Sequence, residues 1–166
     1  MSSSAAVGCD VLRPLECAWQ RPQQLLVGDK LWLCVDSSPF WMAWVVQGEE
    51  STCECVVTFR GCDGSVVDSC HHPASPVRAF IHGGCETDLP ELPLELLRSL
   101  AERVTEVRSS GGSGSITLVG FSHGGLMALA CALWLGGGGG PSCCSDLDPL
   151  TLDAAHLFNC GNQQRK

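Results

Sequence analysis

The chain has 166 residues, 45% of them hydrophobic and 17% charged, which fits one globular domain and excludes a disordered chain. Its formal net charge is −8, and it has no cluster of Lys or Arg residues that could neutralise phosphates. These two features exclude nucleic acid as a partner. The start MSSSAAVGCDVLRPLECAWQ lacks the basic first part and apolar core of a signal peptide, and the apolar run Leu126–Leu135 has about half the length of a bilayer span. We therefore expect no signal peptide and no transmembrane segment, which favours a cytoplasmic location.

The first half of the chain predicts short strands. Residues 1–30 carry Pro14 and Pro22 and form a lead-in with at most one short helix. Three apolar, aromatic or β-branched runs follow, separated by turn-forming residues, and each predicts a strand: LWLCV (31–35), FWMAWVV (40–46) and CECVVTF (53–59). After a loop, VRAFIH (77–82) predicts a fourth strand or an extended segment.

The second half alternates helices and strands. Apolar residues recur every three or four positions from Pro93 to Arg108, which predicts an amphipathic helix that SSGGSG (109–114) ends. A short buried strand (116–119), a buried helix (124–135) and a last strand AHLFN (155–159) are expected after it. Strand, helix, strand, helix and strand over 77–159 favour a mostly parallel sheet covered by helices.

We expect a single domain over residues 1–166. After the lead-in, residues 31–135 form its core, residues 136–154 a glycine-rich linker, and residues 155–166 the last strand and a polar tail.

The twelve cysteines are many for a chain of this length. Because no signal peptide is expected, we interpret most of them as small buried hydrophobic residues with free thiols, and disulfides are the alternative. No Cys-x-x-Cys pair occurs, and Cys53-x-Cys55, Cys70-His71-His72 and His82-x-x-Cys85 do not match zinc-ligand spacing. We therefore expect neither a metal nor a cofactor.

The segment Gly120-Phe121-Ser122-His123-Gly124 fits the pattern Gly-x-Ser-x-Gly between a predicted strand and a predicted helix. On such a turn a serine adopts a strained backbone conformation, and the flanking glycines avoid steric clashes. The helix that follows directs its free N–H groups at an anion forming there. Ser122 is therefore a candidate nucleophile. The alternatives are a glycine-rich turn with a bystander serine, and a dinucleotide-binding turn that lacks its middle glycine.

Three segments together resemble the class 3 (fungal-type) lipases of the α/β-hydrolase fold: VVTFRGC (56–62), FIHGGC (80–85) and ITLVGFSHGGLMALACAL (116–133). The resemblance covers residues 40–135, and HLFNCGN (156–162) extends it weakly. It implies an incomplete α/β-hydrolase, with a mostly parallel twisted sheet and helices on both faces. It also implies a serine ester hydrolase acting on acylglycerols or related lipid esters.

By the same resemblance Ser122 is the nucleophile, Gly120 and Gly124 are the glycines of its elbow, and the backbone N–H groups of Cys62 and His123 form the oxyanion hole. Cys62, Phe121 and His123 depart from the residues usual in the family.

Nothing after Ser122 matches the family's acid and base motifs, although catalysis needs both. In the tail, Asp153 and two earlier aspartates precede His156 in the required order, but His156 reads better as a residue at a strand edge. His71, His72 and His82 precede Ser122 and belong to other parts of the sheet. The competing hypothesis is a truncated or degenerate, non-catalytic lipase-like module that binds lipid or a protein partner, with an open sheet edge available to that partner.

Overall fold

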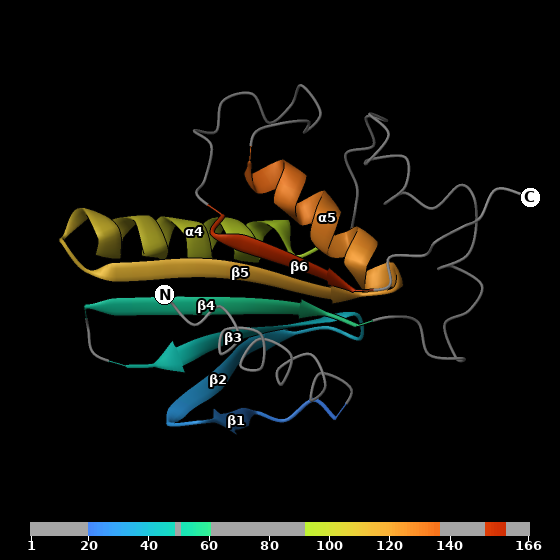
Figure 1. The fold of residues 1–166 in the computed structure, drawn as a ribbon, viewed down its shortest axis with the longest axis horizontal. Helices are drawn as coiled ribbons and strands as arrows, with labels where there is room; N and C mark the ends of the chain where they lie inside the picture. The colour runs from blue at the N-terminus through green and yellow to red at the C-terminus, as the bar shows by residue number, and fades with distance from the viewer. Residues whose placement is uncertain (1–19, 49–50, 61–91, 137–151, 159–166) are drawn as a thin grey trace, which may run out of the picture.

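The computed structural model describes residues 20–48, 51–60, 92–136 and 152–158, which form one six-stranded sheet with two helices (Figure 1). The predicted α/β class is confirmed. In chain order the elements are β1 (Gln24–Val27), β2 (Lys30–Ser37), β3 (Trp41–Gln47), β4 (Thr52–Phe59), α4 (Leu94–Ser109), β5 (Ser113–Phe121), α5 (His123–Leu135) and β6 (Ala154–Phe158).

The strands lie side by side in sequence order, from β1 at one edge to β6 at the other. Neighbours from β1 to β4 are antiparallel, whereas β5 is parallel to both β4 and β6. The prediction of a mostly parallel sheet is therefore wrong. The reason is the length of the connections: only a few residues separate β1, β2, β3 and β4, and connections that short form hairpins, whereas a parallel crossover needs a dozen residues or more.

Both described helices pack on the same face of the sheet. Alternate residues of β4 and β5, from Cys53 to Phe59 and from Ile116 to Leu118, form one core with Leu97 of α4 and Met127 of α5. Figure 1 shows α4 and α5 side by side over this part of the sheet. The sequence predicted helices on both faces, and the described part of the chain places them on one.

The opposite face carries a second apolar cluster, which consists of Val27, Trp32, Met42, Trp44, Val56 and Val119. Two linked hydrogen bonds run through this cluster. The indole N–H of Trp44 donates to Thr58 Oγ1 at 3.3 Å, and the Thr58 hydroxyl donates to the carbonyl oxygen of Met42 at 3.2 Å. Because Thr58 is fully buried, these bonds satisfy a polar group that would otherwise destabilise the sheet.

Most predicted elements occur within a few residues of their expected bounds. The predicted strands 31–35, 40–46, 53–59, 116–119 and 155–159 correspond to β2, β3, β4, β5 and β6, and the two predicted helices to α4 and α5. The predicted strand 77–82 lies outside the described residues. One strand was missed: β1 falls within the predicted lead-in and joins β2 through Gly28 and Asp29, where Gly28 has φ of +61°. A Gly-Asp pair between two apolar runs is a hairpin signal.

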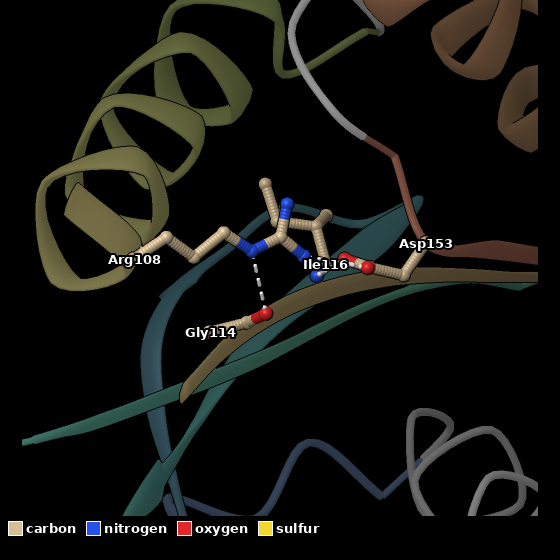
Figure 2. A network of polar contacts seen from close by, with 4 residues as sticks. All are labelled: Arg108, Gly114, Ile116 and Asp153. Atoms are coloured by element: carbon tan, nitrogen blue, oxygen red, sulfur yellow. Dashed lines mark hydrogen bonds and ion pairs between the residues drawn. The ribbon is translucent and has the colours of Figure 1, made fainter. Parts of the chain in front are cut away.

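The start of β6 is held by Asp153 (Figure 2). Its carboxylate accepts a hydrogen bond from the Ile116 N–H at 2.7 Å and pairs with the Arg108 guanidinium at 2.5 Å. Arg108, in the last turn of α4, also donates through Nε to the carbonyl oxygen of Gly114 at 2.9 Å. One carboxylate thus joins the end of α4, the middle of β5 and the segment that enters β6.

Replacing Asp153 by alanine is expected to lower the free energy of unfolding by about 1–2 kcal/mol, because it removes a partly exposed ion pair and leaves the Ile116 N–H without its acceptor. Asp153→Asn retains an acceptor oxygen and should lose about half as much. Urea unfolding of both variants measures the difference. Equal losses would show that the ion pair, and not the bond to Ile116, is responsible.

The four cysteines in the described part of the chain are free thiols, as predicted: Cys34, Cys53, Cys55 and Cys131. Cys53 and Cys55 point to the helix face from β4, with their Sγ atoms 3.7 Å apart. Burial raises the pKa of Cys131, and burial together with the neighbouring Cys53 thiol raises the pKa of Cys55. Burial also raises the pKa of Cys34, which is only partly buried.

A raised pKa lowers the thiolate fraction at neutral pH, and the thiolate is the reactive form. We therefore expect iodoacetamide to alkylate Cys34 in the native protein while it leaves Cys55 and Cys131 unmodified until denaturant is added. Peptide mass mapping of native and denatured samples tests this order. Rapid native alkylation of Cys131 would contradict the packing of α5 against the sheet.

Candidate active site

Ser122 occupies the sharp turn between β5 and α5. Its backbone has φ of +56° and ψ of −120°, and it is one of two described residues other than glycine with positive φ. This conformation is strained for a residue with a Cβ atom, and such strain persists only where surrounding contacts impose it. A serine in a strained strand-to-helix turn at the end of a strand is the geometry of a nucleophile elbow.

The two flanking glycines are required by close backbone contacts. A Cβ atom on Gly120 would lie 2.3 Å from the carbonyl oxygen of Gly124. A Cβ atom on Gly124 would lie 2.2 Å from the carbonyl oxygen of Phe59 and 2.5 Å from that of Arg60. Neither position accepts a side chain, which explains in physical terms why both ends of the Gly-x-Ser-x-Gly pattern are glycine.

Backbone hydrogen bonds fix Ser122 on both sides of the turn. Its N–H donates to the carbonyl oxygen of Phe158 in β6 at 2.8 Å, and its carbonyl oxygen accepts from the Gly125 N–H at 3.0 Å. Its side chain is half-buried and does not cap α5. The role of Phe158 was missed from the sequence because it involves only the backbone and therefore leaves no side-chain signal.

Helix α5 begins at His123, directly after Ser122. The first N–H groups of a helix have no intrahelical acceptor, and the helix dipole adds positive potential there. No acidic residue lies in the first turn of α5 to offset that potential. The His123 side chain is only 8% exposed. The predicted oxyanion donor, the His123 N–H, thus belongs to the first turn of this helix, where an anion is favoured.

The end of β4 approaches the elbow from the other side. Phe59 is in register with Gly120, and the carbonyl oxygens of Phe59 and Arg60 face Gly124. Arg60 is held there by a hydrogen bond from its N–H to the carbonyl oxygen of Phe40 at 3.0 Å. The second predicted oxyanion donor, Cys62, lies outside the described residues, two positions after Arg60.

Asp153 and His156, the candidate acid and base after Ser122, do not lie beside it. His156 is in register with Val119 and shares the face of Phe158, the side of the sheet opposite the helices. Along β6, the Cα of His156 lies two residues, or roughly 7 Å, before the Cα of Phe158, the residue whose carbonyl oxygen binds Ser122. Asp153 lies five residues before Phe158, at the far end of β6, and binds Arg108. Asp153 and His156 therefore do not form an acid–base pair beside Ser122.

The other histidines considered as a base for Ser122 lie outside the described residues: His71, His72 and His82. Among the residues that the structure describes, no group of three or more His, Cys, Asp or Glu side chains is arranged to hold a metal ion. Neither described helix is long and apolar enough to cross a membrane.

A groove of about 550 Å³ lies on the helix side of the sheet, but not beside Ser122. Its floor is formed by Leu33, Val35 and Val45 and its wall by the last turns of α4 from Arg103 to Ser110. Thr52, at the start of β4, also lines it, whereas Ser122 follows the opposite ends of the parallel strands. The groove therefore does not serve as the substrate pocket of Ser122.

Comparisons with protein-family models, curated proteins and solved structures found no match.

Replacing Gly124 by alanine is expected to lower the free energy of unfolding by about 3 kcal/mol, because the new methyl group would meet two backbone carbonyl oxygens that side-chain rotation cannot move. Gly136→Ala is the matched control at the other end of α5. Its nearest contact is the Ala132 carbonyl oxygen at 3.2 Å, and a loss below about 1 kcal/mol is expected. Thermal and urea unfolding compare the two. Similar losses would contradict the close approach of β4 to the elbow.

Proposed function

We propose that the chain is a lipase-like serine ester hydrolase of the class 3 type, built on an α/β-hydrolase fold and acting on acylglycerols or related lipid esters. The observation that carries the proposal is the backbone of Ser122, with φ of +56° between a strand and a helix and with a glycine on each side that has no room for a Cβ atom. A bystander serine has no need of this conformation, which costs about 1–3 kcal/mol.

In the proposed reaction, Ser122 Oγ attacks the acyl carbonyl carbon while a general base takes the hydroxyl proton. The carbonyl oxygen becomes an oxyanion held by the N–H groups of His123 and Cys62. The alcohol then leaves with a proton from the protonated base, and water releases the acid from the acyl-enzyme by the same steps. Support for the donor at His123 comes from its place in the first turn of α5, where no carboxylate competes.

His156 is not a candidate for the base, because it lies on the far face of the sheet. Single alanine variants of His71, His72, His82 and His123 test whether a histidine of this sequence supplies the base.

An apolar substrate suits the surroundings of Ser122. Phe121, directly before it, is 40% exposed, and Leu157, in register with Gly120, is 38% exposed. Leu157 points to the same side of the sheet as its partner Gly120, and Phe121, the next residue of β5, points to the opposite side. The two side chains therefore project from opposite faces of the sheet, close to the turn. Large apolar groups exposed beside a nucleophile favour an acyl chain over a polar ester.

The alternative function is a non-catalytic lipase-like module that binds lipid or a protein partner through the same surface. It is favoured by one observation: neither Asp153 nor His156, the acid and the base that the described tail offers, is in a position to activate Ser122. Loss of such a pair typically lowers turnover by several orders of magnitude.

A fluorophosphonate probe, which reacts only with an activated serine, distinguishes the two functions. We expect the native chain to be labelled at Ser122 and the heat-denatured chain to remain unlabelled. Ser122→Ala should abolish labelling. Ser99→Ala is the matched control, because Ser99 lies exposed on α4 and its hydroxyl donates to the Glu95 carbonyl oxygen.

Labelling that persists in Ser122→Ala would refute the assignment of the nucleophile. A folded chain that resists the probe entirely would refute hydrolase activity and leave the binding module as the function. Circular dichroism of each sample establishes that it is folded.

A further inference from the structure

The groove between β2, β3 and the last turns of α4 has an aliphatic lining that the candidate active site does not use. Leu33, Val35 and Val45 form its floor, and Val107 contributes to its wall. Val35 is 49% exposed, and Leu26, which faces the same side of the sheet from β1, is 67% exposed. Large aliphatic side chains that meet water beside a hollow of about 550 Å³ are typical of a surface that binds an apolar ligand.

The size and lining of the groove favour a small molecule with a flexible hydrocarbon chain. Its volume lies within the roughly 300–1,000 Å³ of small-molecule sites. Eleven described residues line it, whereas one side of a stable protein interface has roughly 20–30 residues. None of the described lining residues is aromatic, so the groove offers a planar ligand no ring to stack on.

Arg103 supplies a positive charge to the groove. It is the one basic side chain among the described residues of the lining, and it is exposed. Within the described part of the chain no hydrogen bond or ion pair holds its guanidinium, whereas Arg98 pairs with Glu95 and Arg108 with Asp153. A guanidinium in this state is able to form two parallel hydrogen bonds with a carboxylate.

The charge of Arg103 acts on the floor of the groove as well as on the solvent. Burial and the neighbouring Cys53 thiol raise the pKa of Cys55, and the positive charge of Arg103 opposes this by lowering it. Cys55 is in register with Val45, a residue of the floor. The guanidinium therefore lies close to the aliphatic floor, as the head group of an amphiphilic ligand would require.

We propose that the groove binds an aliphatic monocarboxylate, with the carboxylate at Arg103 and the hydrocarbon chain along the aliphatic floor. This site is separate from Ser122, because the groove and Ser122 lie at opposite ends of the parallel strands. The proposal rests on the proposed function for the source of its ligand, since hydrolysis of an acylglycerol releases a fatty carboxylate. Bound in the groove, that product is held away from the nucleophile.

Glu106 is the opposing charge in the groove, three residues after Arg103 on α4. At 0.1 M salt, exposed charges more than about 10 Å apart are largely screened, so these two groups influence the ligand more than the net charge of −8 does. Because Arg103 is exposed, its pairing with a carboxylate is weak, and we expect a dissociation constant in the high micromolar to millimolar range.

An NMR titration of the ¹⁵N-labelled full chain with decanoate tests the proposal. The Ser122→Ala variant is used, so that no nucleophile takes part. Decanoate should shift the amide signals of Val35, Val45 and Val107 and saturate at one ligand per chain. Acetate, which has the head group without the chain, and 1-decanol, which has the chain without the charge, should each bind at least about fivefold more weakly.

Three charge variants test the position of the carboxylate. Arg103→Gln should weaken decanoate binding about fivefold, and Glu106→Gln should strengthen it about twofold. Arg21→Gln is the matched control, because it removes the same charge from an exposed side chain that bonds to Ser37, outside the groove, and it should leave binding unchanged. The dispersion of each spectrum establishes that the variant is folded.

Shifts confined to residues around Ser122, or an affinity that Arg103→Gln leaves unchanged, would overturn the proposal. If Arg103→Gln does not fold, Val35→Asp provides the same test, because it places a negative charge at an exposed position of the floor and should abolish binding. The fluorophosphonate result is independent of this one. A chain that binds decanoate at Arg103 but resists the probe retains the groove site and is not a hydrolase, and the reverse result retains only the hydrolase.

Discussion

The contact between Gly124 and the end of β4 determines the geometry of the region around Ser122. With the Phe59 carbonyl oxygen only 2.2 Å from where a Cβ atom would stand, the first turn of α5 lies directly against the strand backbone. This approach is possible only with glycine, and it sets the angle at which the chain leaves β5. The strained conformation of Ser122 follows from it, because a more relaxed turn would move α5 away from β4.

The two ends of the parallel part of the sheet are stabilised by different kinds of interaction. At the end where β5 meets α5, close backbone packing and two backbone hydrogen bonds hold Ser122. At the other end, the carboxylate of Asp153 joins α4, β5 and the start of β6: one oxygen pairs with the Arg108 guanidinium and the other accepts a hydrogen bond from the Ile116 N–H. β6 is therefore fixed at both of its ends. This matters because the Phe158 carbonyl oxygen positions the N–H of Ser122 only if β6 keeps its register with β5.

Local pattern was sufficient to predict β2, β3, β4, β5 and both helices, because each is long enough to show its periodicity in apolar residues. It did not predict strand direction, which depends on connection length, and it missed β1, a strand of four residues with one buried side chain. Gly120 and Gly124 are marked by the local sequence because they lie two residues on either side of Ser122, and the structure shows close backbone contacts at both positions. The role of Asp153 was not, because its partner Arg108 is 45 residues away in the sequence and nothing local marks the pair.

Ser122 also depends on a strand that lies at the edge of the described sheet. Its N–H donates to the Phe158 carbonyl oxygen in β6, and among the described strands β6 has one neighbour where β5 has two. Edge strands open more readily than central ones, because fewer hydrogen bonds break when they separate. An added strand along β6, whatever its source, would restrict that opening. It would thereby hold the Phe158 carbonyl oxygen against Ser122, so the stability of the strained turn is physically coupled to the occupancy of this edge.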